Sequence, residues 1–101
     1  MKLYIDTSNS EKILIKLDNK KYETQSKNEK SQKLLSFIDK TLNSSGNAIE
    51  DIKEIEVNTG PGSFTGLRVG VSVANTIGWI LGVSVNGKDL RKGQIIKINY
   101  S

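Results

Sequence analysis

The residues whose types suit chemistry gather in two short stretches, each at the end of a strand-like run. Asp6, Thr7 and Ser8 close the first run, and a glycine-rich loop, residues 58–66 (Asn-Thr-Gly-Pro-Gly-Ser-Phe-Thr-Gly), follows the second. A glycine-rich turn between a strand and a helix can bind an anion, because its free N–H groups and the helix dipole point the same way. The candidate phosphate-binding residues are Asp6, Thr7, Gly60, Gly62, Ser63 and Thr65.

The spacing of this loop differs from that of known phosphate-binding loops. A P-loop ends in Gly-Lys-Ser/Thr, whereas Leu67 follows Gly66 here, and a dinucleotide fingerprint needs its third glycine where Thr65 stands. The favoured interpretation is therefore a structural turn in which Ser63 or Thr65 caps the following helix. For Asp6 and Thr7 both ligand binding and a turn into the next strand remain open.

The amino-acid composition limits which catalytic and metal-binding groups the chain can offer. The chain of 101 residues has no cysteine and no histidine, so it lacks thiolate ligands and the commonest general base. Asp6 is the one obvious metal-directed carboxylate, and a single carboxylate is a poor magnesium site. We therefore expect no catalytic residue, no metal and no cofactor. A net charge of +4 with 6% aromatic residues does not favour a dedicated nucleic-acid module.

Hydrophobic periodicity predicts the elements that position these stretches. Strands are expected at 2–8, 12–17, 22–25, 54–58 and 83–85, helices at 31–43 and 67–81, and a weakly alternating extra strand at 94–100. This order predicts an α/β fold, a single ribonuclease-H-like lobe with two main helices. Its mixed five-stranded sheet takes the order 3-2-1-4-5, which the right-handed crossovers favour.

The second predicted helix carries a stripe of small residues. Gly66, Gly70, Ala74, Gly78 and Gly82 recur every four residues and so share one face. A glycine inside a helix costs about 1 kcal/mol relative to alanine, and close approach of another backbone is the usual compensation. Most of the helix circumference is apolar or small. We expect the helix to pack on its own sheet and to meet a second helix, which the shortness of the chain suggests belongs to another molecule.

The residues expected to line the core or this contact surface are Leu34, Leu35, Ile38, Leu42, Gly66, Gly70, Ala74 and Gly78. For any one of them, simple core burial is an equally good interpretation. The uncharged stretch 69–87 contains glycines and polar residues that disfavour a transmembrane helix. Met1-Lys2 leads straight into a strand with no signal peptide, so a cytoplasmic location is expected.

Residues 60–70, Gly-Pro-Gly-Ser-Phe-Thr-Gly-Leu-Arg-Val-Gly, resemble the signature of the TsaB (YeaZ) family of tRNA threonylcarbamoyladenosine biosynthesis proteins. Residues 5–8, 31–39 and 52–58 resemble the family's first strand, its first helix and the strand before the signature. The resemblance covers about residues 1–87, which we expect to form a TsaB-like N-terminal lobe. Residues 88–101 would then be a divergent tail.

The resemblance implies the actin and sugar-kinase fold and a non-catalytic scaffold role. TsaB-like proteins bind and activate a catalytic paralogue, TsaD, which transfers threonylcarbamoyl to adenosine 37 of tRNAs, and an ATPase, TsaE, completes the bacterial set. Helices of the first lobes make the contact between TsaB-like proteins and TsaD. The resemblance thus implies tRNA as an indirect partner, reached through TsaD. Family members normally have two lobes, and the TsaD branch binds its metal through paired histidines. The present chain has one lobe's length and no histidine.

Two alternatives are carried beside the scaffold. One is a small nucleotide- or phosphate-binding protein of the actin-like ATPase superfamily, with Asp6, Thr7, Gly62 and Ser63 holding the phosphate. The other is a homodimeric module with no role in tRNA modification, which uses the same helices in an isologous contact.

Overall fold

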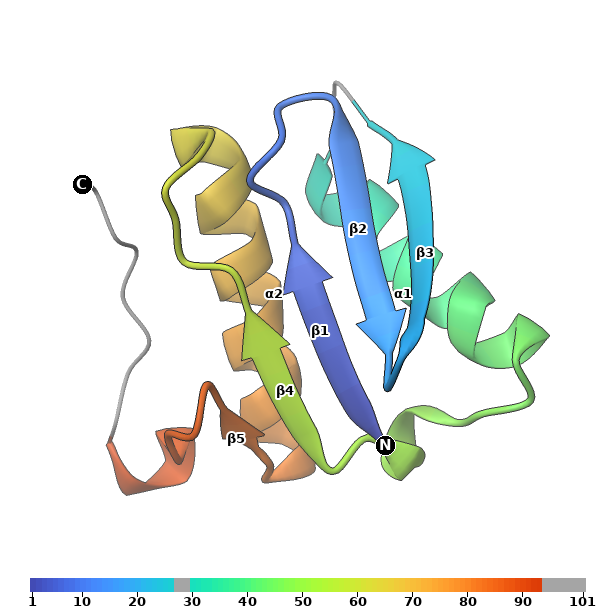
Figure 1. Ribbon diagram of the computed structural model, residues 1–101. Helices are drawn as coiled ribbons and strands as arrows, with labels where there is room; N and C mark the ends of the chain where they lie inside the picture. Colours follow the sequence, from blue (N-terminus) through green and yellow to red (C-terminus); the bar gives the residue numbers. More distant parts are fainter. Residues whose placement is uncertain (27–29, 94–101) are drawn as a thin grey trace.

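A mixed sheet of five strands carries both long helices on one face (Figure 1). The computed structural model describes residues 1–26 and 30–93. In chain order the elements are β1 (Lys2–Asp6), β2 (Lys12–Leu17), β3 (Lys20–Gln25), α1 (Lys30–Ser44), the 3₁₀ turn η1 (Ile49–Asp51), β4 (Glu54–Val57), α2 (Phe64–Leu81), β5 (Ser84–Val85) and the 3₁₀ turn η2 (Leu90–Lys92).

The predicted strand order is confirmed: the sheet reads β3-β2-β1-β4-β5. β1, β2 and β3 form an antiparallel meander, and β4 and β5 then add in parallel to β1. Each parallel connection needs a crossover, which α1 and α2 supply on the same side of the sheet. The predicted extra strand at 94–100 lies outside the described residues.

Two elements begin earlier than the sequence predicted, because a helix cap and a tight turn set their first residues. α2 begins at Phe64 rather than Leu67, because the Ser63 side chain accepts a hydrogen bond from the Gly66 amide and so caps the helix. β3 begins at Lys20 rather than Tyr22, because Asp18 takes a positive φ of 54° and the chain turns within two residues.

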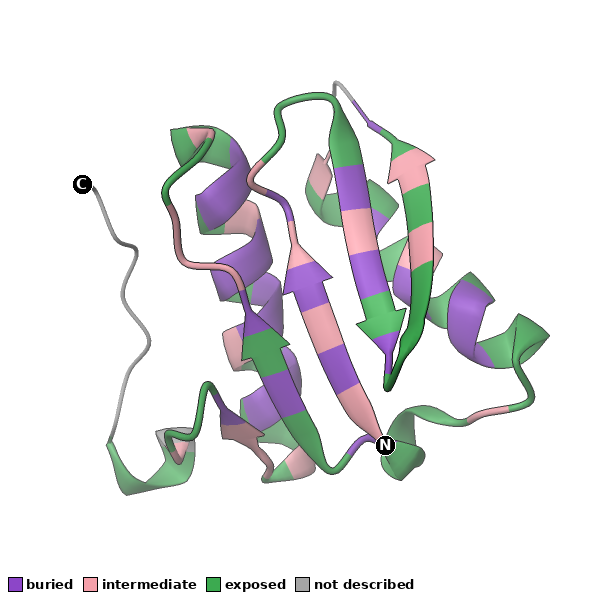
Figure 2. Cartoon of the chain, viewed as in Figure 1, coloured by how far each residue is buried: buried purple, intermediate pink, exposed green. Residues whose placement is uncertain are grey.

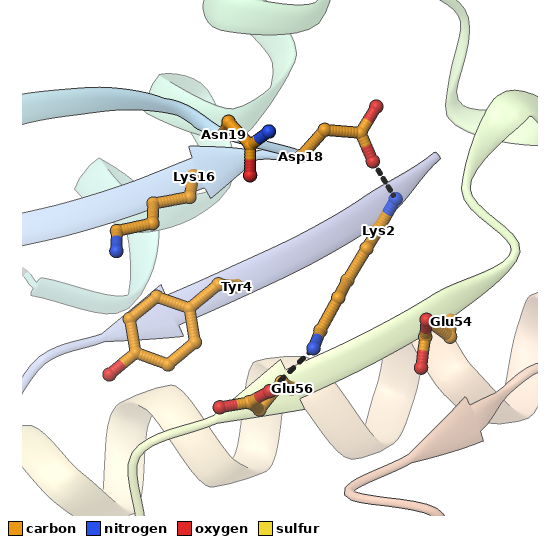
Figure 3. Close-up of a pocket in the computed structure, with 7 residues that line it drawn as sticks. All are labelled: Lys2, Tyr4, Lys16, Asp18, Asn19, Glu54 and Glu56. Atoms are coloured by element: carbon orange, nitrogen blue, oxygen red, sulfur yellow. Dashed lines mark hydrogen bonds and ion pairs between the residues drawn. The ribbon is translucent and has the colours of Figure 1, made fainter.

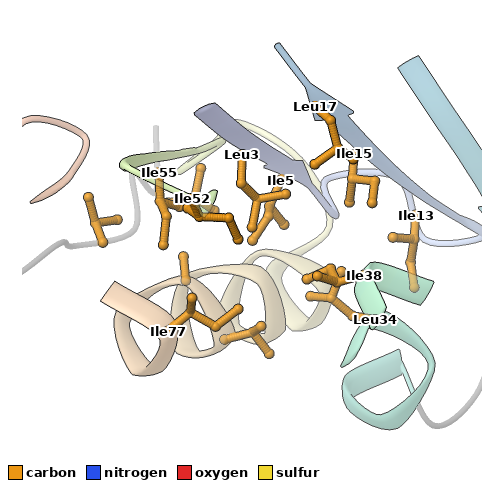
Figure 4. Close-up of a cluster of buried hydrophobic side chains, with 14 of the residues drawn as sticks. Leu3, Ile5, Ile13, Ile15, Leu17, Leu34, Ile38, Ile52, Ile55 and Ile77 are labelled. Carbon is orange, nitrogen blue, oxygen red and sulfur yellow. The ribbon is translucent and has the colours of Figure 1, made fainter. Parts of the chain in front are cut away.

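The core lies between the sheet and the two helices (Figure 2). Alternate strand residues point towards the helices, among them Leu3, Ile5 and Ile15, each fully buried (Figure 4). From the helices, Leu34, Ile38 and Ile77 meet them. The period of two along the strands thus places one apolar set against the apolar faces of both helices.

The opposite face of the sheet is polar and uncovered. Side chains from β1, β2, β4 and the β2–β3 turn line a shallow hollow of about 720 Å³ there (Figure 3): Lys2, Tyr4, Lys16, Asp18, Asn19, Glu54 and Glu56. The Lys2 ammonium lies 2.6 Å from the Glu56 carboxylate. Such solvated pairs stabilise a fold little, but they make this face compatible with water.

A side chain completes the outer edge of β4. β5 pairs with Glu54 and Ile55 only. Beyond it, the Asn86 side chain accepts a hydrogen bond from the Val57 amide at 2.8 Å and donates one to the Val57 carbonyl at 3.1 Å. Asn86 has a φ of 50°, a conformation that asparagine tolerates better than most residues. The Asn86 side-chain amide therefore takes the place of a strand residue that would otherwise pair with Val57.

We predict that Asn86→Gly lowers the free energy of unfolding by about 1–2 kcal/mol, because both hydrogen bonds to Val57 are lost. Glycine adopts the positive φ without strain, so the change introduces no backbone strain of its own. Urea unfolding followed by circular dichroism measures the effect. An unchanged unfolding midpoint would show that the Asn86 amide adds nothing to the sheet.

Candidate interaction surface and glycine-rich loop

The end of β1 lies directly against the first turns of α2. Thr7 is fully buried, and its hydroxyl donates a hydrogen bond to the Gly66 carbonyl. A Cβ at Gly66 would collide with the Thr7 carbonyl oxygen, and one at Gly70 would collide with the Thr7 hydroxyl. These two glycines are therefore required by the close approach of the chain's own first strand.

The Asp6 carboxylate is the hydrogen-bonding centre of the adjoining loops. Its Oδ1 accepts from the Ser8 amide at 2.9 Å, the Ser8 hydroxyl at 2.6 Å and the Asn58 side chain at 3.2 Å. Partial burial alone would raise the pKa of Asp6. The hydrogen bonds from Ser8 and Asn58 outweigh it, so the pKa lies below its ordinary value. Asp6 is thus an ionised carboxylate that ties the end of β1 to the loop after β4.

The glycine-rich loop uses many of its own donors. The Gly60 amide donates to the Asn58 side chain, the Ser63 amide to the Ser8 carbonyl, and the Gly66 amide to the Ser63 hydroxyl. A phosphate cradle needs such N–H groups free. Gly62 packs on Ser8, with room for no side chain. This arrangement favours the structural interpretation of Asp6, Thr7, Gly60, Gly62 and Ser63, while Thr65 is exposed on the first turn of α2.

No metal site accompanies the loop in the described part of the chain. Residues 1–26 and 30–93 contain no group of three or more histidine, cysteine, aspartate or glutamate side chains that could hold a metal ion.

The predicted contact residues separate into two kinds. Seven of the eight are buried within the chain: Leu34, Ile38, Leu42, Gly66, Gly70, Ala74 and Gly78. Leu35 alone is exposed, to 52%. Because Gly70 and Ala74 are enclosed by the chain's own residues, bulky substitutions at these positions would disturb the fold as well as any partner contact.

The most exposed apolar residues of the helix layer include Leu35, which was a predicted contact residue, and Ile80, which was not. Trp79 and Ile80 near the end of α2 are 55% and 66% exposed, and Leu35 on α1 is comparably open. Between the two helices and η1 lies a hollow of about 340 Å³, whose lining is mixed. Its apolar residues include Leu35, Ile38, Leu42, Ile49 and Ile77, and its polar ones are Asp39, Asn43, Asn47 and Glu50. We call Leu35, Trp79, Ile80 and this hollow the helix-layer surface. Apolar residues surround most of α2, so the helical period placed Trp79 in the narrow arc of Arg68 and Ser72 but did not indicate that Ile80 faces outward.

A family model described as "TsaD: tRNA N6-adenosine threonylcarbamoyltransferase" matches residues 22–87. The tRNA threonylcarbamoyladenosine biosynthesis protein TsaB of Bacillus subtilis (strain 168) is 35% identical over 65 residues, which are 64% of this chain and 28% of that protein. TsaB of Escherichia coli (strain K12) is 39% identical over 46 residues, 46% of this chain and 20% of the relative. Each match thus takes in less than a third of the relative's length.

Among solved structures, YeaZ from Pseudomonas aeruginosa superposes with a TM-score of 0.70 at 24% identity, covering 83% of this chain and 41% of that one. The sheet order and this likeness show that the chain has the fold of the matched part of YeaZ. With the sequence matches across β3 to β5, the chain belongs to the TsaD/TsaB family of tRNA threonylcarbamoyladenosine proteins, on its TsaB (YeaZ) side.

The helices in the described part of the chain offer no candidate membrane span. Within residues 1–26 and 30–93, none is both long enough and apolar enough to cross a bilayer.

We predict that Gly66→Ala lowers the free energy of unfolding by about 1–3 kcal/mol, because the new Cβ overlaps the Thr7 carbonyl. This loss should appear even though alanine is the better helix former. The matched control is Ser72→Ala on the exposed face of α2, which should stay within about 0.5 kcal/mol of wild type. Equal stabilities of the two variants in urea would contradict the close approach.

Stability should also depend on the Asp6 charge. The folded-state pKa of Asp6 is lowered, so its contribution is present above the ordinary value of 3.8 and is lost as the pH falls through the folded-state pKa. We predict that Asp6→Asn flattens the acid side of the curve of unfolding free energy against pH. Parallel curves for wild type and variant would show that the carboxylate makes no charge-dependent contribution.

Proposed function

We propose that this chain is a non-catalytic TsaB-like scaffold that binds a TsaD-like catalytic paralogue through the helix-layer surface. By doing so it would support the formation of threonylcarbamoyladenosine at adenosine 37 of tRNA. The observation that carries the proposal is the exposure of Leu35, Trp79 and Ile80 on the helix layer, where Leu35 also lines the hollow beside η1. The chain's relatives are named for this pathway.

The contrast between the two sides of the molecule supports this choice of surface. The bare face of the sheet is lined by charged and polar groups that water solvates well. The helix layer instead leaves three large apolar side chains more than half exposed. Full burial of an aliphatic side chain is worth about 1.5–3 kcal/mol, and tryptophan is enriched among the residues that dominate binding energy. A partner therefore gains most by covering the helix layer.

The scaffold role is also supported by the hydrogen bonds that the glycine-rich loop makes within the chain. Asp6, Thr7 and Ser63 are committed to hydrogen bonds within the chain, and the sequence has neither histidine nor cysteine. The chemistry would then come from the TsaD-like paralogue, with a TsaE-like ATPase as a further member of the assembly. We take residues 1–87 as the TsaB-like lobe, 88–101 as a divergent tail, and the cytoplasm as the place of action.

The test is co-purification with the TsaD-like protein of the same organism, followed by titration calorimetry. We predict that Leu35→Glu raises the dissociation constant at least tenfold, because a carboxylate would be buried against an apolar partner. A tenfold change corresponds to about 1.4 kcal/mol of binding free energy. The control is Gln25→Glu, which adds a carboxylate at an exposed position of β3 far from the helix layer, directly opposite Lys12 of β2.

Circular dichroism should first show that both variants are folded. Equal loss of binding in both variants, or no loss in Leu35→Glu, would remove the helix-layer surface as the contact. Light scattering of the isolated chain tests the homodimer, and a Leu35-dependent dimer with no TsaD binding would favour that alternative. Heat released on titration with Mg-ATP would instead favour a nucleotide-binding protein.

A further inference from the structure

The turn after β5 sends an arginine back to the end of α2. The Arg91 Nε donates to the Trp79 carbonyl at 2.9 Å, and its Nη2 donates to the Ile80 carbonyl at 3.0 Å. The Asp89 side chain accepts from the Arg91 amide at 2.9 Å and the Asp89 carbonyl from the Lys92 amide at 3.1 Å. The turn that carries Arg91 is thus itself held by hydrogen bonds.

The end of α2 has a specific need for this side chain. The last carbonyls of a helix have no partner within it. At α2 the Gly82 and Val83 amides both return to the Gly78 carbonyl, and the last turn contains no basic residue. The Trp79 and Ile80 carbonyls are the next in line, and Arg91 binds both. Its positive charge also lies at the negative end of the helix dipole, where a cation is stabilising.

Gly82 leaves the space that the guanidinium occupies. A Cβ at Gly82 would come within 2.7 Å of Nη1 of Arg91. Gly82 also has a φ of 69°, so the same glycine both ends the helix and admits the arginine. We call this arrangement the Arg91 cap.

We infer that Arg91 is a positioning residue for the helix-layer surface. The two carbonyls that it binds belong to Trp79 and Ile80, the two most exposed large apolar residues of the described chain. Helix ends otherwise fray. Holding this turn in one conformation lowers the entropy that a partner must remove on binding. The inference rests on the proposed function, and Arg91 lies beyond residues 22–87, the segment matched by the family model.

The experiment compares wild type with Arg91→Ala, using Lys92→Ala in the same 3₁₀ turn as the matched control. Trp79 is the only tryptophan, so its fluorescence anisotropy reports directly on the last turn of α2. In Arg91→Ala we expect lower fluorescence anisotropy of Trp79 and at least fivefold faster hydrogen exchange at the Gly82 and Val83 amides. We also expect an approximately fivefold higher dissociation constant for the TsaD-like protein. Lys92→Ala should match wild type in all three.

Arg91→Lys serves as a second variant if Arg91→Ala is poorly folded, because lysine keeps the charge but cannot bind two carbonyls with a planar fork. It should give values between those of wild type and alanine.

If exchange and anisotropy stay unchanged in a folded variant, the Arg91 cap does not hold the turn and the inference fails. If they change but the dissociation constant does not, the positioning role fails. If wild type itself does not bind the TsaD-like protein, the proposed function fails together with the positioning role, and the exchange data still decide whether the cap holds the helix.

Discussion

The contact on which the rest of the structure depends is the seating of Thr7 against Gly66 and Gly70. The four-residue spacing places both glycines on one face of α2, and the absence of Cβ atoms there lets the helix lie directly on the end of β1. The Thr7 hydroxyl then bonds to the Gly66 carbonyl. Because this contact fixes how α2 is rotated about its axis, it also decides which residues of α2 face the core and which face outward.

The strand order and the two helices were predictable, because periods of two and of about 3.6 residues are written into the apolar pattern. The small-residue stripe correctly indicated close approach of a backbone. It did not identify that backbone, which at Gly66 is the carbonyl of the chain's own Thr7, whereas Gly70 meets the Thr7 side chain. The start of α2 depended on a choice between Ser63 and Thr65 as the cap, which only the geometry of the Ser63 hydroxyl and the Gly66 amide decides.

The surface was harder to predict than the fold. A helix that is apolar on most sides gives only a weak signal of its rotation. The helical period placed Trp79 in a narrow arc with Arg68 and Ser72, which are also exposed, but it did not distinguish Ile80 from the core residues. The long-range contacts were also hidden from the sequence. Arg91 lies eleven and twelve residues from its two carbonyl partners, and Asn58 lies fifty-two residues from Asp6, separations at which local patterning carries no information.

The pairing of Asn86 with Val57 has a consequence for how the protein behaves in a crowded solution. A strand edge with free amides and carbonyls is a template onto which a neighbouring chain can add, and proteins guard against such growth by blunting their edges. Here the two groups of Val57 that would recruit another strand are occupied by a side-chain amide. At this position the sheet therefore offers no free backbone pair on which another strand could add.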